Sequence, residues 1–375
     1  MGLLTTQPFK GVYALGAFTF ELARLPLWLV KYLTSYGRQH PEWSYRQALG
    51  VRIFFSAVHH LAAVQAKTPL PHTPGKEKER FIIIKAAEGK YFKGPLVSNE
   101  DVKPTDIGGT WYPAPLSASS DLGNVLVVLH IHGGAYVIGD GRTEASGYFA
   151  KKVLKHTPAT HILCPQYRLS TLPASKTSNP FPAALQDSLT SYLYLLHELK
   201  IPAANIVLSG DSAGANNAIA LLRYLAEYGA ELGVPHPSAA LLWSPWVDPS
   251  DSSDDYTRTN PNYATDYLPY AFIHWGSTAY AGLGSLDTPY ACLKHRDAGF
   301  KTPVPLFVNA GSAEILYFDD KEWAEMMRGR GNNVTWDVER NAPHDVLLLG
   351  NVLGFDKEAA RSAQRAGEWL TGLRK

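Results

Sequence analysis

Residues 206–222 read IVLSGDSAGANNAIALL, an apolar run, a serine flanked by glycines, and then an apolar pattern with helical spacing. Strand, turn and helix in this order are the context in which Gly-x-Ser-x-Gly carries a nucleophile. The two glycines permit a turn so sharp that the hydroxyl stands above the strand ends. We therefore predict that Ser212 is a nucleophile and that the amide of Ala213 stabilises a developing oxyanion.

A second glycine pair follows another apolar run. The sequence HGGA at residues 132–135 comes directly after residues 125–131, which are nearly all apolar. Two consecutive glycines let backbone amides approach a substrate oxygen closely. The amides of Gly133 and Gly134 are therefore predicted to complete an oxyanion hole with that of Ala213.

The general base is expected late in the chain, because nucleophile, acid and histidine follow one another in this arrangement. His344 meets this condition, since the sequence NAPHD at residues 341–345 comes after the last predicted strand. Four other histidines are given different roles. His274 and His295 lie in a predicted insertion, His132 is expected to brace the glycine loop, and His130 is expected to lie in the core.

The acid is predicted to be Glu314, which lies in the loop after a predicted strand and precedes His344 in the chain. Asp319 and Asp320 are alternatives, but they fall a helical turn later and are expected to cap a helix or face solvent. Asp345 adjoins the histidine in sequence, so its side chain is poorly directed toward that ring.

From residue 80 onward, β-rich apolar runs alternate with helical segments such as residues 182–199 and 213–228. This alternation predicts an α/β fold with a mostly parallel, eight-stranded sheet and helices on both faces. The strands are expected at residues 81–85, 109–112, 125–131, 161–164, 206–209, 239–243, 306–309 and 334–338.

Residues 249–300 interrupt this alternation, because they open with a polar loop and then become aromatic. They are interpreted as an insertion that, with an N-terminal segment of residues 1–79, forms a helical cap over the carboxyl ends of the strands. The core is then residues 80–248 and 301–375. An aromatic cap favours a fairly bulky apolar substrate.

The N-terminal stretch between residues 11 and 31 is predicted to be an amphipathic helix. Glu21, Arg24 and Pro26 interrupt its apolar residues, which argues against a membrane-spanning helix, and no secretory signal is recognised. Two interpretations remain open. The favoured one is a helix packed on its own protein, and the other is peripheral contact with a membrane surface.

Composition narrows the function further. The 375 residues include 35 basic and 34 acidic ones, which makes nucleic-acid binding unlikely because phosphates require a basic excess. Cys164 and Cys292 are too few for a disulfide framework or a thiolate metal cage and fit a cytoplasmic location. No metal-binding or nucleotide-binding motif is found, so no cofactor and no metal are expected.

Six short motifs occur together over residues 80–375: HGGAY at 132–136, YRL at 167–169, FPAA at 181–184 with Asp187, GDSAG at 210–214, SPW at 244–246 and PH at 343–344. Together they resemble the hormone-sensitive-lipase-like branch of the α/β-hydrolase fold. The resemblance implies a carboxylic-ester hydrolase with a helical cap, and architectural roles for Tyr167, Arg168 and Asp187.

Two departures from that family stand out. The family's usual acid is aspartate where this chain has Glu314, and the glycine loop ends in Ala135 rather than a third glycine. The long aromatic N-terminus looks like that of fungal members, including steryl acetyl hydrolases and esterases of secondary metabolism.

The sequence thus predicts an ester hydrolase with a triad of Ser212, His344 and Glu314 and an acyl-enzyme intermediate. Its expected partner is a small-molecule ester, and the oligomeric state is left open. Two alternatives stand beside this one: an acyltransferase or lactonase on the same triad, and a non-catalytic binding protein on a hydrolase scaffold.

Overall fold

The computed structural model describes residues 2–97, 102–116, 120–250 and 252–375. Met1 and Asp251, which fall within the predicted cap segments, lie outside the described residues. Eight strands form one sheet: β1 (Phe81–Ile84), β2 (Ile107–Tyr112), β3 (Val127–Ile131), β4 (His161–Gln166), β5 (Ile206–Asp211), β6 (Ala239–Trp243), β7 (Leu306–Gly311) and β8 (Val334–Glu339). Each falls on a predicted run, with ends that differ by no more than two residues.

The strand order is β1-β2-β4-β3-β5-β6-β7-β8. Only β2 pairs in antiparallel fashion, with β1 and with β4, and the pairs from β4 to β8 are parallel. The carboxyl ends of β5, β6, β7 and β8 therefore meet at one edge of the sheet. This confirms the predicted α/β-hydrolase fold with a mostly parallel sheet.

Helices cover both faces of the sheet, because its central strands are apolar on both sides. In β3, Val127 and Leu129 pack into one core, which contains residues of α4 and α5, whereas Val128 packs into the other, which contains residues of α3 and α10. The helices of the body are α3 (Thr143–His156), α4 (Ala183–Leu193), α5 (Ala213–Leu232), α8 (Tyr317–Gly329), α9 (Val346–Leu353) and α10 (Asp356–Leu373).

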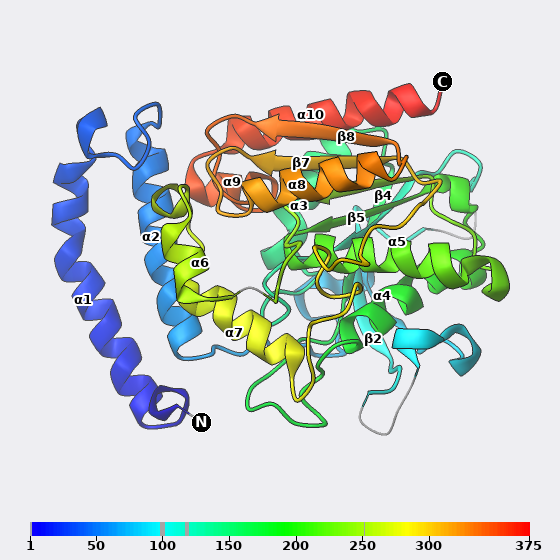
Figure 1. Ribbon diagram of the computed structural model, residues 1–375, viewed down its shortest axis with the longest axis horizontal. Coiled ribbons are helices and arrows are strands. Elements are labelled where there is room, and N and C mark those ends of the chain that lie inside the picture. Colours follow the sequence, from blue (N-terminus) through cyan, green and yellow to red (C-terminus); the bar gives the residue numbers. More distant parts are fainter. Residues whose placement is uncertain (1, 98–101, 117–119, 251) are drawn as a thin grey trace.

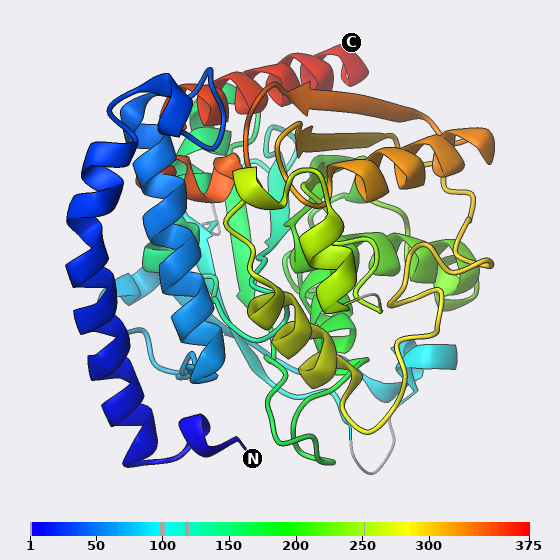
Figure 2. The same ribbon diagram turned by 60° about the vertical axis from the view of Figure 1, so that its left-hand side comes forward.

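Four further helices come from the two segments predicted as a cap: α1 (Phe9–Lys31), α2 (Tyr45–Ala63), α6 (Asp254–Thr259) and α7 (Tyr270–Ala281). Figure 1 shows α2, α6 and α7 at the end of the sheet toward which the arrowheads of β7 and β8 point. Helix α2 packs against α7 and α9. In both views α1 stands outside α2, away from the sheet (Figure 2).

Helix α1 occupies the place of the predicted amphipathic helix and runs along α2, but none of its residues is buried. Among the described residues, no helix is both long enough and apolar enough to span a bilayer.

Candidate active site

The turn between β5 and α5 holds Ser212 in a strained backbone conformation, with φ of 51° and ψ of −119°. Its flanking residues have no room for a side chain. A Cβ atom on Gly210 would lie 2.3 Å from the carbonyl oxygen of Gly214, and one on Gly214 would lie 2.0 Å from that of Ile131. The glycines of the motif are thus required by close backbone contacts, and Ser212 is left partly exposed above a buried turn.

The loop after β3 lies directly beside this serine. A Cβ atom on Gly133 would sit 3.0 Å from the Cβ of Ser212. The Gly133 amide, however, donates to both carboxylate oxygens of Asp211, each at 2.9 Å. The predicted contribution of Gly133 to the oxyanion hole is therefore wrong, because its hydrogen is already engaged.

Other amides in the same loop remain available. Among the residues that the structure describes, the amides of Gly134, Ala135 and Ala213 donate to no acceptor. A Cβ atom on Gly134, where φ is +104°, would lie 2.2 Å from the carbonyl oxygen of Ile138, so this tight loop requires glycine. We take these three amides as the candidate oxyanion hole, with Gly134 and Ala213 as predicted and Ala135 in place of Gly133.

The histidine that precedes the loop braces it. His132 Nδ1 lies 2.8 Å from the carbonyl oxygen of Gly133, and its ring stacks on Tyr167 with centroids 4.2 Å apart. The Tyr167 hydroxyl donates to the carbonyl oxygen of His132 at 2.8 Å. Burial lowers the pKa of His132, so the ring is held neutral. These contacts give His132 the bracing role that the sequence predicts.

His344 follows β8 and is almost completely buried. Its Nδ1 lies 3.5 Å from Glu314 Oε2, a distance at which catalytic pairs are often found before substrate binds. Burial by itself lowers the pKa of His344, but the neighbouring Glu314 carboxylate raises it, and the net change is a rise. In this position the Glu314 carboxylate would stabilise a protonated His344.

Two aspartates connect the loops that carry Ser212 and His344. Asp211 precedes Ser212 and Asp345 follows His344, and their buried carboxyl groups interact with each other. Burial and the charge of Asp211 raise the pKa of Asp345 well above its usual value. Its carboxyl group also caps α9 by accepting from the Leu348 amide at 3.2 Å.

The carboxylates that competed with Glu314 have different surroundings. Asp319 accepts hydrogen bonds from Lys294 Nζ at 2.7 Å and from the Tyr256 hydroxyl at 2.6 Å. Asp320 was expected to cap a helix or face solvent, which is wrong, because it is fully buried beside Glu314. Burial and the Glu314 charge raise the pKa of Asp320 well above its usual value.

Ser244, at the end of β6, connects the acid to the histidine loop. Its hydroxyl donates to Glu314 Oε2 at 2.6 Å and accepts from the Asp345 amide at 3.1 Å. Sequence analysis noted Ser244 only as part of the SPW motif and gave it no role in the site. A second signal was its position, at the end of the strand between those that carry Ser212 and Glu314.

Asp266, from the insertion between β6 and β7, clamps both catalytic loops. It accepts from the His344 amide at 3.2 Å with Oδ1 and from the Ile315 amide at 2.7 Å with Oδ2. Nearby, Asn262 Nδ2 donates to the carbonyl oxygen of Glu314 at 2.9 Å. Burial raises the pKa of Asp266 to about 6, even though the charge of His344 opposes the rise. Sequence analysis did not identify this residue.

The N-terminal segment also reaches the histidine loop. Trp43 Nε1 donates to the carbonyl oxygen of Asn341 at 2.6 Å, and Glu42 accepts from Asn341 Nδ2 at 2.8 Å.

A cavity of about 90 Å³ lies near the loop that follows β3 and is lined by Val137 and Trp275, among others. Within the described residues, no three histidine, cysteine or acidic side chains are grouped in a way that could hold a metal ion.

The chain is similar to known proteins in sequence. A family model described as alpha/beta hydrolase fold matches residues 128–348. An acetyl-hydrolase of Streptomyces hygroscopicus is 28% identical over 211 residues, which cover 56% of this chain and 64% of that protein. The esterase LipU of Mycobacterium tuberculosis is 25% identical over 251 residues, or 65% of this chain and 76% of that protein. This chain thus spans less than two thirds of the Streptomyces relative.

Solved structures show the same fold. An esterase of the bacterial hormone-sensitive lipase family aligns with a TM-score of 0.61 at 21% identity, covering 88% of this chain and 98% of its own. EstE5, in crystals soaked with p-nitrophenyl butyrate, aligns with a TM-score of 0.59 at 22% identity, covering 86% of this chain and 98% of its own.

Proposed function

Because this chain belongs to the alpha/beta hydrolase fold family, we propose that it is a serine hydrolase that cleaves carboxylic esters. A fold does not fix a function, so the proposal depends on the site. The observation that supports it most is the strained turn that holds Ser212 next to backbone amides without acceptors. Asp211 and Asp345 connect this turn to the loop of His344, a buried histidine that lies beside the Glu314 carboxylate. The esterase and acetyl-hydrolase relatives support the same class of reaction.

In the proposed acylation, His344 takes the proton of Ser212 as Oγ attacks the ester carbonyl carbon. The carbonyl oxygen becomes an oxyanion that accepts from the amides of Gly134, Ala135 and Ala213. The tetrahedral intermediate then collapses, the bond to the alcohol oxygen breaks, and His344 returns its proton to the leaving alcohol. The product is an acyl ester on Ser212.

Deacylation uses the same groups in reverse order. His344 takes a proton from water, the hydroxide attacks the acyl carbon, and the bond to Ser212 Oγ breaks as the proton returns to the serine. Glu314 stabilises the imidazolium that forms at His344. Ser244 donates to the same carboxylate oxygen that faces His344, which holds that oxygen in place.

The relative from Streptomyces is named an acetyl-hydrolase, which favours a small acyl group. We therefore propose a short acyl group on a bulkier apolar alcohol.

Two other functions on the same scaffold make different predictions. An acyltransferase or lactonase would use the same triad with an alcohol in place of water, and a binding protein would not use the triad at all. The presence of Ser212, Glu314 and His344 at one edge of the sheet favours catalysis over binding alone. The relatives named esterase and acetyl-hydrolase favour hydrolysis over acyl transfer.

A serine-directed fluorophosphonate tests the proposal. We expect wild-type protein to be labelled and Ser212→Ala to remain unlabelled. Wild type should also hydrolyse p-nitrophenyl acetate, and Ser212→Ala should not. A correctly folded wild type that takes no label would contradict catalysis and favour the binding protein. Product analysis with an added apolar alcohol separates hydrolysis from acyl transfer, because transfer yields a new ester in place of the free acid.

A further inference from the structure

Helix α1 arranges its side chains in the opposite way to a helix packed on a globular protein. A helix turns roughly 100° per residue, which places all four charged residues of α1 within an arc of roughly 80°. They are Lys10, Glu21, Arg24 and Lys31. The part of this arc around Glu21 faces the protein, because Glu21 Oε1 lies 3.3 Å from His60 Nε2 of α2. Lys31, at one end of the arc, is exposed.

The opposite, outer face of α1 has no charge and is almost wholly apolar. Val12, Leu15, Phe18 and Val30 each expose 67–69% of their surface. The large apolar residues of α1 that are exposed are Phe9, Val12, Leu15, Phe18, Phe20, Leu22, Leu27, Leu29 and Val30. A contiguous apolar surface of this kind marks an interaction site, because single exposed apolar residues are common but continuous patches are not.

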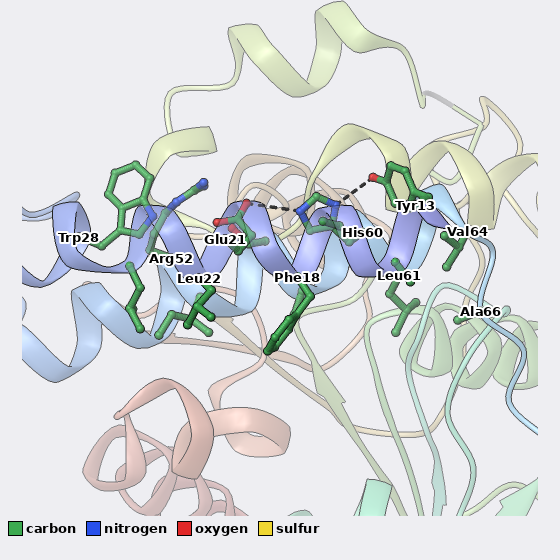
Figure 3. A pocket seen from close by; sticks show the side chains of 16 residues that line it. Tyr13, Phe18, Glu21, Leu22, Trp28, Arg52, His60, Leu61, Val64 and Ala66 are labelled. Atoms are coloured by element: carbon green, nitrogen blue, oxygen red, sulfur yellow. Dashed lines mark hydrogen bonds and ion pairs between the residues drawn. The ribbon is translucent and has the colours of Figure 1, made fainter. Parts of the chain in front are cut away.

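The apolar surface continues into a groove between α1 and α2 with a volume of about 540 Å³. Phe18 and Leu22 belong both to the outer face and to the lining of the groove, and Ile53 and Leu61 line it from α2. Figure 3 shows Phe18, Leu22 and Leu61 on one side of the helix pair, with the hydrogen-bonded Tyr13, His60 and Glu21 on the other.

We propose that α1 lies flat on an anionic lipid surface, with its outer face among the acyl chains and lipid tails in the groove. Helices with one strongly apolar face and cations beside it bind membranes in this way. Contacts along α2, from Tyr13 to Trp28, hold α1 beside the body of the protein. That arrangement favours a helix in the plane of the surface.

Charge identifies the lipid as anionic. Residues 2–40 contain four basic residues and one acidic residue, whereas the net charge of the whole chain is only +1. Lys31 is exposed at the edge of the apolar face, and its Nζ lies 5.6 Å from the centroid of the Trp28 ring. Lysine and tryptophan side chains are favoured at the level of lipid headgroups.

Co-sedimentation of the full-length protein with vesicles tests the proposal. One set of vesicles is pure phosphatidylcholine, and the other contains three parts phosphatidylserine to seven parts phosphatidylcholine. Leu15→Glu/Val30→Glu places charge on the outer face without touching the groove lining. Leu283→Glu/Leu373→Glu is the matched control, because Leu283 and Leu373 are also exposed but lie outside this region. Lys10→Glu/Lys31→Glu tests the contribution of charge.

We expect wild type and the control to bind anionic vesicles, and the outer-face variant to bind at least tenfold more weakly. The lysine variant should lose the preference for phosphatidylserine. Thermal unfolding in the absence of vesicles should occur at the same temperature in all four proteins, which shows that they are folded.

Three results would overturn the proposal. They are equal binding to both kinds of vesicle, binding that survives in the outer-face variant, and a lipid-free dimer that this variant converts to a monomer without any vesicle binding. The last result would assign the face to a second copy. The inference does not depend on the proposed ester hydrolysis, because vesicle binding is measured separately.

Discussion

The residues from Asn260 to Tyr267 and the helix α1 both belong to the part of the chain that the sequence predicts as a cap, but they are held in opposite ways. The first segment hydrogen-bonds the loops that carry Glu314 and His344, and Asp266 within it is buried. Helix α1 has no buried residue, and it packs along α2 and against the short turn of residues 3–5 that precedes it. The comparison indicates that one part of the predicted cap holds the loops of Glu314 and His344 in place, whereas the other part faces outward.

The comparison requires that the edge of the sheet that carries Ser212, Glu314 and His344 is catalytic, and this is the first point to test. We expect Ser212→Ala to lower kcat for p-nitrophenyl acetate by about 10⁶-fold, since loss of the nucleophile removes the covalent route. Thermal unfolding should change little, because the Ser212 hydroxyl makes no hydrogen bond among the described residues. Substantial turnover in a preparation free of wild type would place the chemistry elsewhere.

The next largest effect is expected from Glu314→Gln, with a fall in kcat of about 10³- to 10⁴-fold, because the amide stabilises the imidazolium far less than a carboxylate does. Asp319→Asn is the matched control. It breaks the ion pair with Lys294 but leaves His344 untouched, so kcat should be nearly unchanged. If the control lost more activity than Glu314→Gln, the acid of the triad would be misassigned.

The same pair of residues determines the pH dependence. Glu314 raises the pKa of His344, and catalysis needs the neutral imidazole, so kcat/KM should fall as the pH drops through a value above 6.5. In the residual activity of Glu314→Gln this acid limb should move to lower pH, because burial then acts on the histidine without its anion. An acid limb at the same pH in both proteins would show that another group controls it.

Asp266→Asn tests the clamp directly. The amide can present only one oxygen, so one of the amides of His344 and Ile315 loses its acceptor. We expect kcat to fall by about 10- to 100-fold through misplacement of the base, and the free energy of unfolding to fall by about 1 to 3 kcal/mol. Asp255→Asn is the control, because Asp255 is exposed in the same insertion.

The stability cost of Asp266→Asn should itself depend on pH. The folded protein raises the pKa of Asp266 from 3.8 to about 6, so it binds this proton more tightly than the unfolded chain does. The stability that the proton contributes is therefore present at low pH and is lost as the pH rises toward 6. Denaturant unfolding at pH 5 should thus show a larger difference between variant and wild type than unfolding at pH 7.

The sequence predicted those parts of the site that depend on local order along the chain. Ser212, Glu314 and His344 each follow a recognisable strand, and parallel strands bring their carboxyl ends to one edge. Asp266 could not be found in this way. Its role arises only because a loop of the insertion folds back onto Ile315 and His344, which lie far away in the sequence.

Two predictions, for Gly133 and for Asp320, were wrong for physical reasons. The sequence cannot reveal that the Asp211 carboxylate takes the amide of Gly133, which moves the free donors one residue along the loop. Asp319 and Asp320 are neighbours on α8 and differ by roughly 100° around its axis. One therefore reaches Lys294, while the other is buried beside Glu314.

The smallest effect on catalysis is expected from removing residues 2–24, and this result would sharpen the comparison most. The deletion takes away most of α1 but keeps Trp28, which packs against Arg52, and Tyr32, which is buried. Since α1 buries none of its residues, kcat/KM for p-nitrophenyl acetate should stay within about threefold, which corresponds to less than 1 kcal/mol of transition-state stabilisation. Binding to anionic vesicles should nevertheless be lost. A tenfold or greater fall in kcat/KM in a protein that unfolds at its normal temperature would mean that α1 helps to shape the active site, and the division of the cap into two parts would no longer hold.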